Sequence, residues 1–192
     1  PARLYAKATV GDAVRIYSVR IDPQVPPNLL NNGDIEAGTQ YWTGYNSSVE
    51  ARTDDVHGGA QSLYVGAATG LGTSGAALNI TNAIKNGASY TVTLWLKAPL
   101  TTVPVRPRIE VTSSTGGTQS FNGGVVTLGA TWTKVTQTLT PSWTGTLTSA
   151  SLSVVRVLTT GAFRLDDATL TEQGTLPPLT ISPGSWRREL VP

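Results

Sequence analysis

Apolar and polar residues alternate with a period of two along most of this 192-residue chain, and no other feature limits its fold as strongly. In YTVTLWLK, residues 90–97, the apolar residues Val92, Leu94 and Leu96 are separated by threonines and Trp95. Successive side chains of a β-strand point to opposite faces of a sheet, so the pattern predicts a strand with one buried face. A long helix would need apolar residues every three or four positions, and the sequence does not indicate one.

Further segments of the same kind follow one another along the chain. In RPRIEVTSS, residues 106–114, Ile109 and Val111 alternate with Arg108 and Glu110. Turns rich in glycine and asparagine, such as KNGAS and NGG, separate the segments. About nine or ten strands at this spacing are typical of two packed sheets. We therefore predict an all-β protein, a two-sheet antiparallel β-sandwich, whose other strands include SLYVG, AALNIT, WTKVTQTLT, ASLSVVRVL and AFRLDDATL.

The composition excludes several classes of protein. Charged residues make up 14% of the chain, and the net charge of +2 is too small to predict a nucleic-acid partner. No apolar run approaches the roughly 20 residues of a membrane span, so no membrane partner is expected. Because the chain has no cysteine, disulfides and thiolate metal sites are excluded. It also has no methionine, and we expect it to be a piece of a larger protein.

The two ends of the chain differ in composition from its middle. Residues 23–27 are predicted to be a proline-rich linker, because proline stiffens the chain and cannot continue a central strand. Residues 175–192 contain four prolines and are predicted to be a proline-rich tail. The β-sandwich is therefore predicted to span residues 28–174.

Residues 1–22 repeat a pattern found at the end of the predicted sandwich. AVRIYSVRI, residues 13–21, aligns with AFRLDDATL, residues 162–170, in the order alanine, apolar, arginine, apolar. We expect residues 1–22 to be the terminal hairpin of a preceding module. In one alternative, two ordinary hairpins share a β composition. In the other, residues 1–22 add two strands to the sandwich at 28–174.

The twelve carboxylates are unevenly placed along the chain. Five lie within residues 34–55, only Glu110 lies between 56 and 165, and Asp166 and Asp167 stand together in the last predicted strand. A carboxylate pair inside a strand is costly to bury unless something neutralises it. A calcium ion, which takes roughly six to eight oxygen ligands in loose geometry, would do so. The alternative is a solvated aspartate pair at the end of a strand.

Five segments, in order between residues 28 and 172, resemble one known family. NLLNNGDIEAG…YW, residues 28–42, is similar to the N-L-L-x-N-G-x-F-E-x-G…W opening of calcium-containing jelly-roll carbohydrate-binding modules found beside xylanases and other glycanases. VHGGAQSLYV, residues 56–65, resembles their V-H-x-G-x-x-S-L-x-V segment. Ile35 departs from the pattern, because the family prefers phenylalanine there. The other matches are GASYTVTLWLKA with G-K-x-Y-T-x-S-F-W-V-K-A, TWTKVTQTLT with W-x-x-V-x-x-x-x-T, and FRLDDATLTE with F-x-L-D-D-V-x-L.

The resemblance implies a jelly-roll fold with a structural calcium ion that joins the chain opening to the last strand. Glu36 matches the family's glutamate, and Asp166 or Asp167 matches its aspartate. Backbone oxygens near Asp34 and Asp54 would complete the coordination shell.

The resemblance also implies non-catalytic binding of a polysaccharide or cell-surface glycan. Sugar rings stack on aromatic side chains, while charged and amide groups bond the hydroxyls. Trp95 lies with Lys97 on the polar face of its predicted strand, and we expect Arg108 and Glu110 on the next strand to share that face. The alternative for each aromatic residue is ordinary packing. The candidates on loops are Trp42, Tyr45, Phe121 and Trp143.

The sequence does not indicate an enzyme. His57 is the only histidine, so histidine-based catalytic and metal sites lack partners. GLGTSG, residues 70–75, matches a dinucleotide-binding glycine pattern, but no βαβ context surrounds it. Glu110 with Asp54 is conceivable as a glycosidase pair, yet nothing singles the two out.

The expected setting is a larger extracellular or virion protein. A rival interpretation is a structural, decoration or host-adhesion domain of a phage tail or fibre, with other virion subunits as partners. A groove lined by exposed aromatic residues would favour sugar binding. A flat face rich in threonine and serine, buried against partner chains, would favour the structural role.

Overall fold

The chain forms two compact units, Pro1–Pro26 together with Gly174–Pro192, and Pro27–Gln173. The tail predicted at 175–192 and the first two residues of the linker predicted at 23–27 lie outside the described part of the chain. The structure, a computed structural model, describes residues 2–10, 13–21, 25–70 and 72–174, with side chains from residue 25 onward.

The smaller unit contains an antiparallel hairpin of two strands, β1 (Ala2–Val10) and β2 (Ala13–Ile21). The two strands form a sheet of their own. An isolated pair of strands is at best marginally stable in water, because it cannot bury an apolar face. That this hairpin ends a preceding module stays a prediction.

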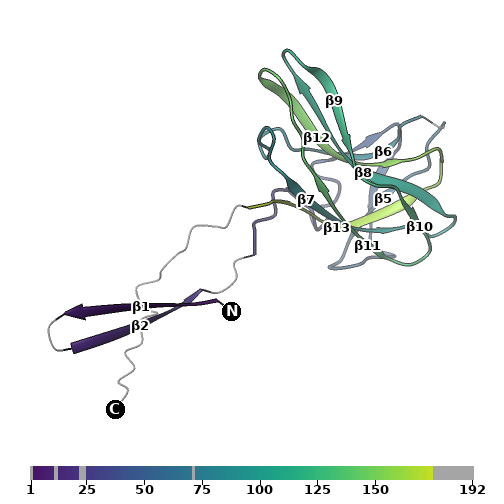
Figure 1. Ribbon diagram of the computed structural model, residues 1–192. Helices are drawn as coiled ribbons and strands as arrows, with labels where there is room; N and C mark the ends of the chain where they lie inside the picture. Colours follow the sequence, from purple (N-terminus) through teal and green to yellow (C-terminus); the bar gives the residue numbers. More distant parts are fainter. Residues whose placement is uncertain (1, 11–12, 22–24, 71, 175–192) are drawn as a thin grey trace. The chain divides into compact units, whose positions relative to one another are not determined.

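The larger unit is a sandwich of two antiparallel sheets, and most of its strands are labelled in Figure 1. The six-stranded sheet has the order β10-β8-β12-β6-β3, with β9 also paired to β8, and the five-stranded sheet has the order β11-β7-β13-β5-β4. The predicted two-sheet antiparallel β-sandwich is confirmed. The strands are β3 (Trp42–Tyr45), β4 (Val49–Arg52), β5 (Ser62–Val65), β6 (Gly75–Asn79), β7 (Tyr90–Lys97), β8 (Val103–Ser113), β9 (Gly117–Asn122), β10 (Val126–Leu128), β11 (Thr133–Leu139), β12 (Leu147–Arg156) and β13 (Phe163–Glu172).

The core lies between the two sheets and is built from the inward positions of the strands. Leu94 and Leu96 of β7 and Ile109 and Val111 of β8 are fully buried. Buried and partly exposed residues alternate without interruption along both strands. Each such side chain contributes roughly 1.5–3 kcal/mol by leaving water. In the ranges that the structure describes, no helix has the length and hydropathy for a membrane crossing.

Strands β7 and β8 are consecutive in sequence but belong to different sheets. The connection at 98–102 therefore crosses from one layer to the other. Trp95, which points outward from β7, lies on the opposite outer surface from Arg108 and Glu110 of β8. The expectation that these residues share one face is wrong, because it treated consecutive strands as neighbours in one sheet.

Candidate functional site

The outer surface of the six-stranded sheet has a floor of small residues along its middle strands. Outward positions of β6 and β12 face one another in register, Ala77 with Ser153 and Asn79 with Ser151. Small side chains leave room above the sheet that larger ones would fill. The outer surface is therefore low along β6 and β12.

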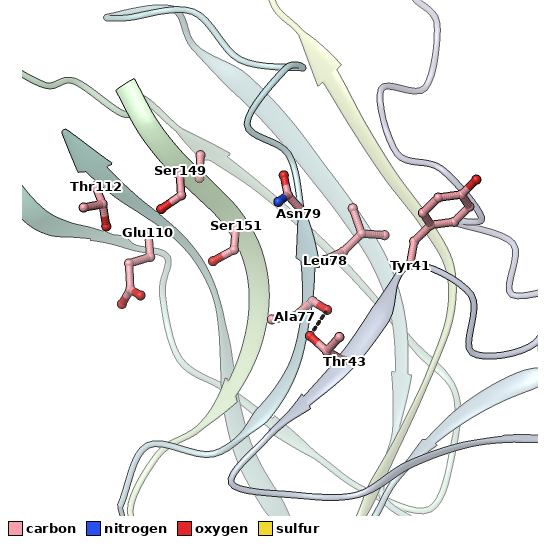
Figure 2. Close-up of a pocket in the computed structure, with 10 residues that line it drawn as sticks. Tyr41, Thr43, Ala77, Leu78, Asn79, Glu110, Thr112, Ser149 and Ser151 are labelled. Atoms are coloured by element: carbon pink, nitrogen blue, oxygen red, sulfur yellow. Dashed lines mark hydrogen bonds between the residues drawn. The ribbon is translucent and has the colours of Figure 1, made fainter. Parts of the chain in front are cut away.

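Larger side chains stand on both sides of this floor. Tyr41 precedes β3 and Tyr45 ends it, and their side chains are 54% and 42% exposed. Arg108 and Glu110 of β8 lie on the other side of β12. Figure 2 shows Tyr41 and Glu110 on opposite sides of the labelled floor residues. The two walls and the floor form a groove, which we call the sheet groove. It is open over Asn79 and Ser151, and at one end the Tyr45 and Arg108 side chains approach each other across the floor.

A pocket of about 330 Å³ lies within the sheet groove. Its size falls in the range of small-molecule sites, roughly 300–1,000 Å³. Hydroxyl, amide and carboxylate groups supply most of its polar character, so it offers many hydrogen-bonding partners. It is lined by Tyr41, Thr43, Ala77, Leu78, Asn79, Glu110, Thr112, Ser149, Ala150 and Ser151.

The charged groups beside the pocket are held by neighbouring side chains. Arg108 Nη2 lies 3.5 Å from Glu110 Oε2, and Arg108 Nε donates a hydrogen bond of 3.3 Å to Ser153 Oγ. Ser120 Oγ of β9 donates to Glu110 Oε2 at 3.2 Å. The Arg108 guanidinium carbon lies 5.7 Å from the centre of the Tyr45 ring. These contacts orient both charged groups before any ligand arrives, which lowers the entropy cost of binding.

The structure brings together three of the seven residues predicted to bind ligand: Tyr45, Arg108 and Glu110. Trp42 instead lies in the core at 3% exposure and donates from Nε1 to the Asn32 carbonyl at 3.0 Å. Phe121 of β9 is paired with the inward-facing Ile109 and packs against the core. Trp143, a further loop candidate, also packs partly against the core.

Trp95 and Lys97 lie on the outer surface of the five-stranded sheet, beneath the segment at 53–61. The His57 imidazole stacks on the Trp95 ring with centroids 3.7 Å apart and 18° between planes. Lys97 Nζ pairs with the Asp55 carboxylate at 2.8 Å. The two side chains fix a loop to the sheet, and the stacked imidazole covers a face of the indole that a sugar would use.

Two of the carboxylates predicted to bind calcium bond to one turn. Asp166, which is fully buried, accepts hydrogen bonds from the backbone amides of His57 at 2.8 Å and Gly58 at 3.2 Å. Glu36 Oε1 accepts from the amides of Ala60 at 2.8 Å and Gln61 at 3.1 Å. Burial raises the pKa of Asp166, and the backbone hydrogen bonds partly offset that rise. We call residues 57–61 the clamped turn.

Of the other carboxylates of the predicted ion site, Asp167 also contacts the clamped turn, whereas Asp54 pairs elsewhere. Asp54 pairs with Arg164 at 2.7 Å, and this hydrogen bond lowers the pKa of Asp54. Asp167 Oδ2 lies 2.6 Å from His57 Nδ1, and Asp34 is exposed. Among the residues with described side chains, no three of the histidines and carboxylates group as a metal site would require. Side-chain ligation by Asp54 therefore does not fit a calcium ion.

Glu36 and Asp166 both lie at the clamped turn, where Asp166 Oδ1 accepts one further hydrogen bond, from the Asp167 amide at 2.8 Å. In the described part of the chain, Glu36 Oε2 accepts no hydrogen bond, so it retains full capacity for a cation. Two carboxylates would leave most of a calcium shell to backbone oxygens, which is an ordinary arrangement for this ion.

Several residues of the sheet groove were not among the predicted ligands. Tyr41 and Asn79 sit at strand ends, and Ser149 and Ser151 occupy outward positions of β12. The alternation in ASLSVVRVL places the serines outward. It does not show that β12 lies in the middle of a sheet between β6 and β8.

A two-layer β-sandwich with an open groove on one sheet, walled by tyrosines and floored by small polar residues, defines a class of ligand-binding domain. Residues 27–157 match the family model CBM_4_9, described as carbohydrate binding domain. The match covers more than half of the chain, and the chain belongs to this family. No curated protein sequence matches it.

Solved structures share the fold. The CBM22-1 xylan-binding domain from Paenibacillus barcinonensis Xyn10C superposes with a TM-score of 0.68 at 18% identity, covering 80% of this chain and 99% of that domain. The C-terminal family 22 carbohydrate binding module of Clostridium thermocellum Xyn10B gives 0.64 at 16% identity, covering 76% and 93%. The enzymatically active domain of bacteriophage CBA120 tailspike protein 4 gives 0.55 at 15% identity, covering 76% of this chain and 21% of that one.

Proposed function

We propose that this domain is a non-catalytic module that binds a polysaccharide chain in the sheet groove. The observation that carries the proposal is the groove itself, with exposed Tyr41 and Tyr45 on one wall and Arg108 and Glu110 on the other. Tyrosine faces suit the C–H faces of sugar rings, and the polar groups suit hydroxyls. Among the residues that the structure describes, Glu110 is the one carboxylate lining the pocket, whereas hydrolysis of a glycosidic bond commonly uses two.

Xylan is the first ligand to test, because the family 22 domain from Paenibacillus with the same fold is described as xylan-binding. Stacking and a few hydrogen bonds give affinities of about 4–8 kcal/mol, from millimolar to micromolar. Titration calorimetry with xylohexaose and a panel of other neutral oligosaccharides measures this directly.

The matched variants are Tyr45→Ala in the groove and Thr136→Ala on the opposite outer surface. Tyr45→Ala is expected to weaken binding about tenfold by removing one stacking face. Thr136→Ala, on exposed β11, is expected to bind like the unaltered chain. Equal affinities for all three proteins, or no binding to any oligosaccharide, would contradict the proposal.

We also propose a structural calcium ion at the clamped turn, held by Glu36, Asp166 and backbone oxygens. It would neutralise the buried charge of Asp166 and tie the chain opening to β13. Binding of sugar does not require the ion, because the turn lies on the five-stranded sheet and the groove on the other.

The larger protein is proposed to be extracellular or part of a virion, with a polysaccharide or cell-surface glycan as partner. A second candidate is a structural or host-adhesion domain of a phage tail, among other virion subunits. The part of the tailspike domain that superposes on this chain, 21% of that domain, favours this candidate. An antibody against the chain separates the two settings. Immunogold label on particle tails supports the virion. Absence of such label, with the antibody recognising a secreted glycanase instead, supports the first setting.

A further inference from the structure

We propose that the sheet groove selects polysaccharides that carry carboxylate groups, and that Arg106 and Arg108 at one end recognise the carboxylate. The inference rests on the proposed function and adds the chemical class of the ligand. A uronic acid substituent on an otherwise neutral chain is the group that these residues fit.

The charges on the outer surface of the six-stranded sheet do not balance. Arg106, Arg108 and Glu110 alternate with buried residues along β8, so all three point to the same outer surface. They leave one net positive charge beside the groove. A glycan site built only for neutral sugars has no need of this excess.

Arg106 differs from every other arginine in residues 25–70 and 72–174. Arg52, Arg108 and Arg164 each pair with a carboxylate, and Arg156 donates hydrogen bonds to backbone and serine oxygens. Within these ranges Arg106 has no ion-pair partner, and its buried Nε donates no hydrogen bond. Arg164 Nε also donates none, but the Arg164 guanidinium is held by Asp54. A guanidinium held at a sheet surface without an acceptor is costly to maintain, and a ligand carboxylate would supply the acceptor.

The position of Arg106 places it beyond the neutral pocket. Arg106 is opposite Val155 of β12, which is opposite Gly75 of β6, and Gly75 is opposite Tyr45. Arg106 and Tyr45 thus occupy one row across the sheet, with Val155 and Gly75 between them. Arg106 lies four positions before Glu110 along β8, a distance of about 13 Å. A ligand chain that leaves the pocket toward this row passes over the contact between Tyr45 and Arg108, because the outward positions Ser153 and Val155 are each 1% exposed.

Arginine suits a carboxylate better than a hydroxyl. Its planar guanidinium donates two parallel hydrogen bonds to the two oxygens of a carboxylate, and such charge-assisted bonds are about twice as strong as neutral ones. Arg108, already held by Tyr45, Ser153 and Glu110, can supply the second cation.

The test compares three ligands of nearly equal size by calorimetry on the full chain. They are a neutral oligosaccharide that binds, with xylohexaose first, the same chain with one glucuronic acid branch, and that branch as its uncharged methyl ester. The acid is expected to bind about tenfold tighter than the ester at low salt. Because exposed charges are screened, the ratio should fall toward one at about 1 M salt.

Variants locate the effect. Arg106→Gln is expected to bring the acid-to-ester ratio to about one, and Arg106→Lys to leave an intermediate ratio, since lysine keeps the charge but not the fork. Lys134→Gln removes one positive charge from the other outer surface and is expected to keep the full ratio. Melting curves establish that each variant is folded.

Two results overturn the inference while the proposed function stands: acid and ester bind the unaltered chain equally, or Lys134→Gln lowers the ratio as much as Arg106→Gln. The ratio in the unaltered chain decides the question even if a variant does not fold. Absence of binding by every oligosaccharide overturns the proposed function, and this inference with it.

Discussion

The stack of His57 on Trp95 shows why a single aromatic residue on a polar face does not by itself mark a sugar site. The sequence places Trp95 outward from its strand, and the structure agrees. What the sequence does not show is that a loop some 40 positions earlier returns to cover it. The stack, together with the pair of Lys97 and Asp55, makes this surface a site of packing.

Trp95→Ala is therefore expected to lower the free energy of unfolding by about 2 kcal/mol and to leave glycan affinity unchanged. The variant removes the platform beneath His57 and opens a cavity under the loop. Urea denaturation and calorimetry measure the two quantities. His57→Ala, which removes the stack but keeps the indole, serves as a milder comparison. If Trp95→Ala lost glycan binding but kept its stability, Trp95 would be a ligand-binding residue.

At the scale of single residues, the sequence predicts direction better than surroundings. Tyr45, Arg108 and Glu110 belong to the groove, whereas Trp42 and Phe121 belong to the core. Trp42 follows a polar, glycine-containing segment and Phe121 precedes one, so the sequence predicts that both lie on loops. Their burial depends on the opposite sheet, and no local pattern encodes that sheet.

The clamped turn contains a glycine that lies against a carboxylate. A methyl group added to Gly59 would come within 2.1 Å of Glu36 Oε1, and its φ of +62° disfavours other residues. Gly87 has a similar φ of +73°, but an added methyl group there meets nothing within 4 Å. The two glycines thus share a backbone cost and differ in the crowding at the carboxylate.

Gly87→Ala is expected to cost about 1 kcal/mol in unfolding free energy, and Gly59→Ala about 1–3 kcal/mol more. The difference between the two variants isolates the contact with Glu36, because the cost of the positive φ cancels. Chemical denaturation of both proteins measures it. Equal costs would mean that the turn and Glu36 move apart freely and that the clamp adds no stability.

Calcium is expected to raise the melting temperature. Ion that binds only the folded chain stabilises it by about 2.7 kcal/mol at 100 times its dissociation constant. Glu36→Gln should abolish this response, and Glu50→Gln, at an exposed pair with Arg52, should keep it. Because backbone amides already hold Glu36 and Asp166, the protein in chelator should still unfold cooperatively at a lower temperature. Identical melting curves in calcium and in chelator would show that no calcium ion stabilises the fold.

At the scale of elements, alternation predicts strands well and neighbours poorly. YTVTLWLK and RPRIEVTSS form β7 and β8 as expected. Their assignment to different sheets depends on the packing of the whole sandwich, since each strand alone is compatible with either layer. The separation of Trp95 from Arg108 follows from this assignment, and so does the location of the groove.

At the scale of the whole molecule, residues 27–173 contain a complete core. The inward residues from both sheets form one cluster within this range. A fragment limited to 27–173 is expected to melt within a few degrees of the full chain and to keep its glycan affinity. Circular dichroism and calorimetry measure both. A fragment that fails to unfold cooperatively would show that the flanking residues belong to the folding unit.

The groove and the clamped turn lie on the outer surfaces of different sheets, with the core between them. Substitutions that tune which glycan is held therefore leave the contacts that secure the turn untouched, and the reverse also holds. Selection can change glycan specificity at Tyr41, Asn79, Arg106 or Arg108 without losing the stabilising contacts of Glu36 and Asp166. The same separation makes the domain a scaffold for laboratory evolution, in which a library confined to one surface samples new sugars while the other surface keeps every member folded.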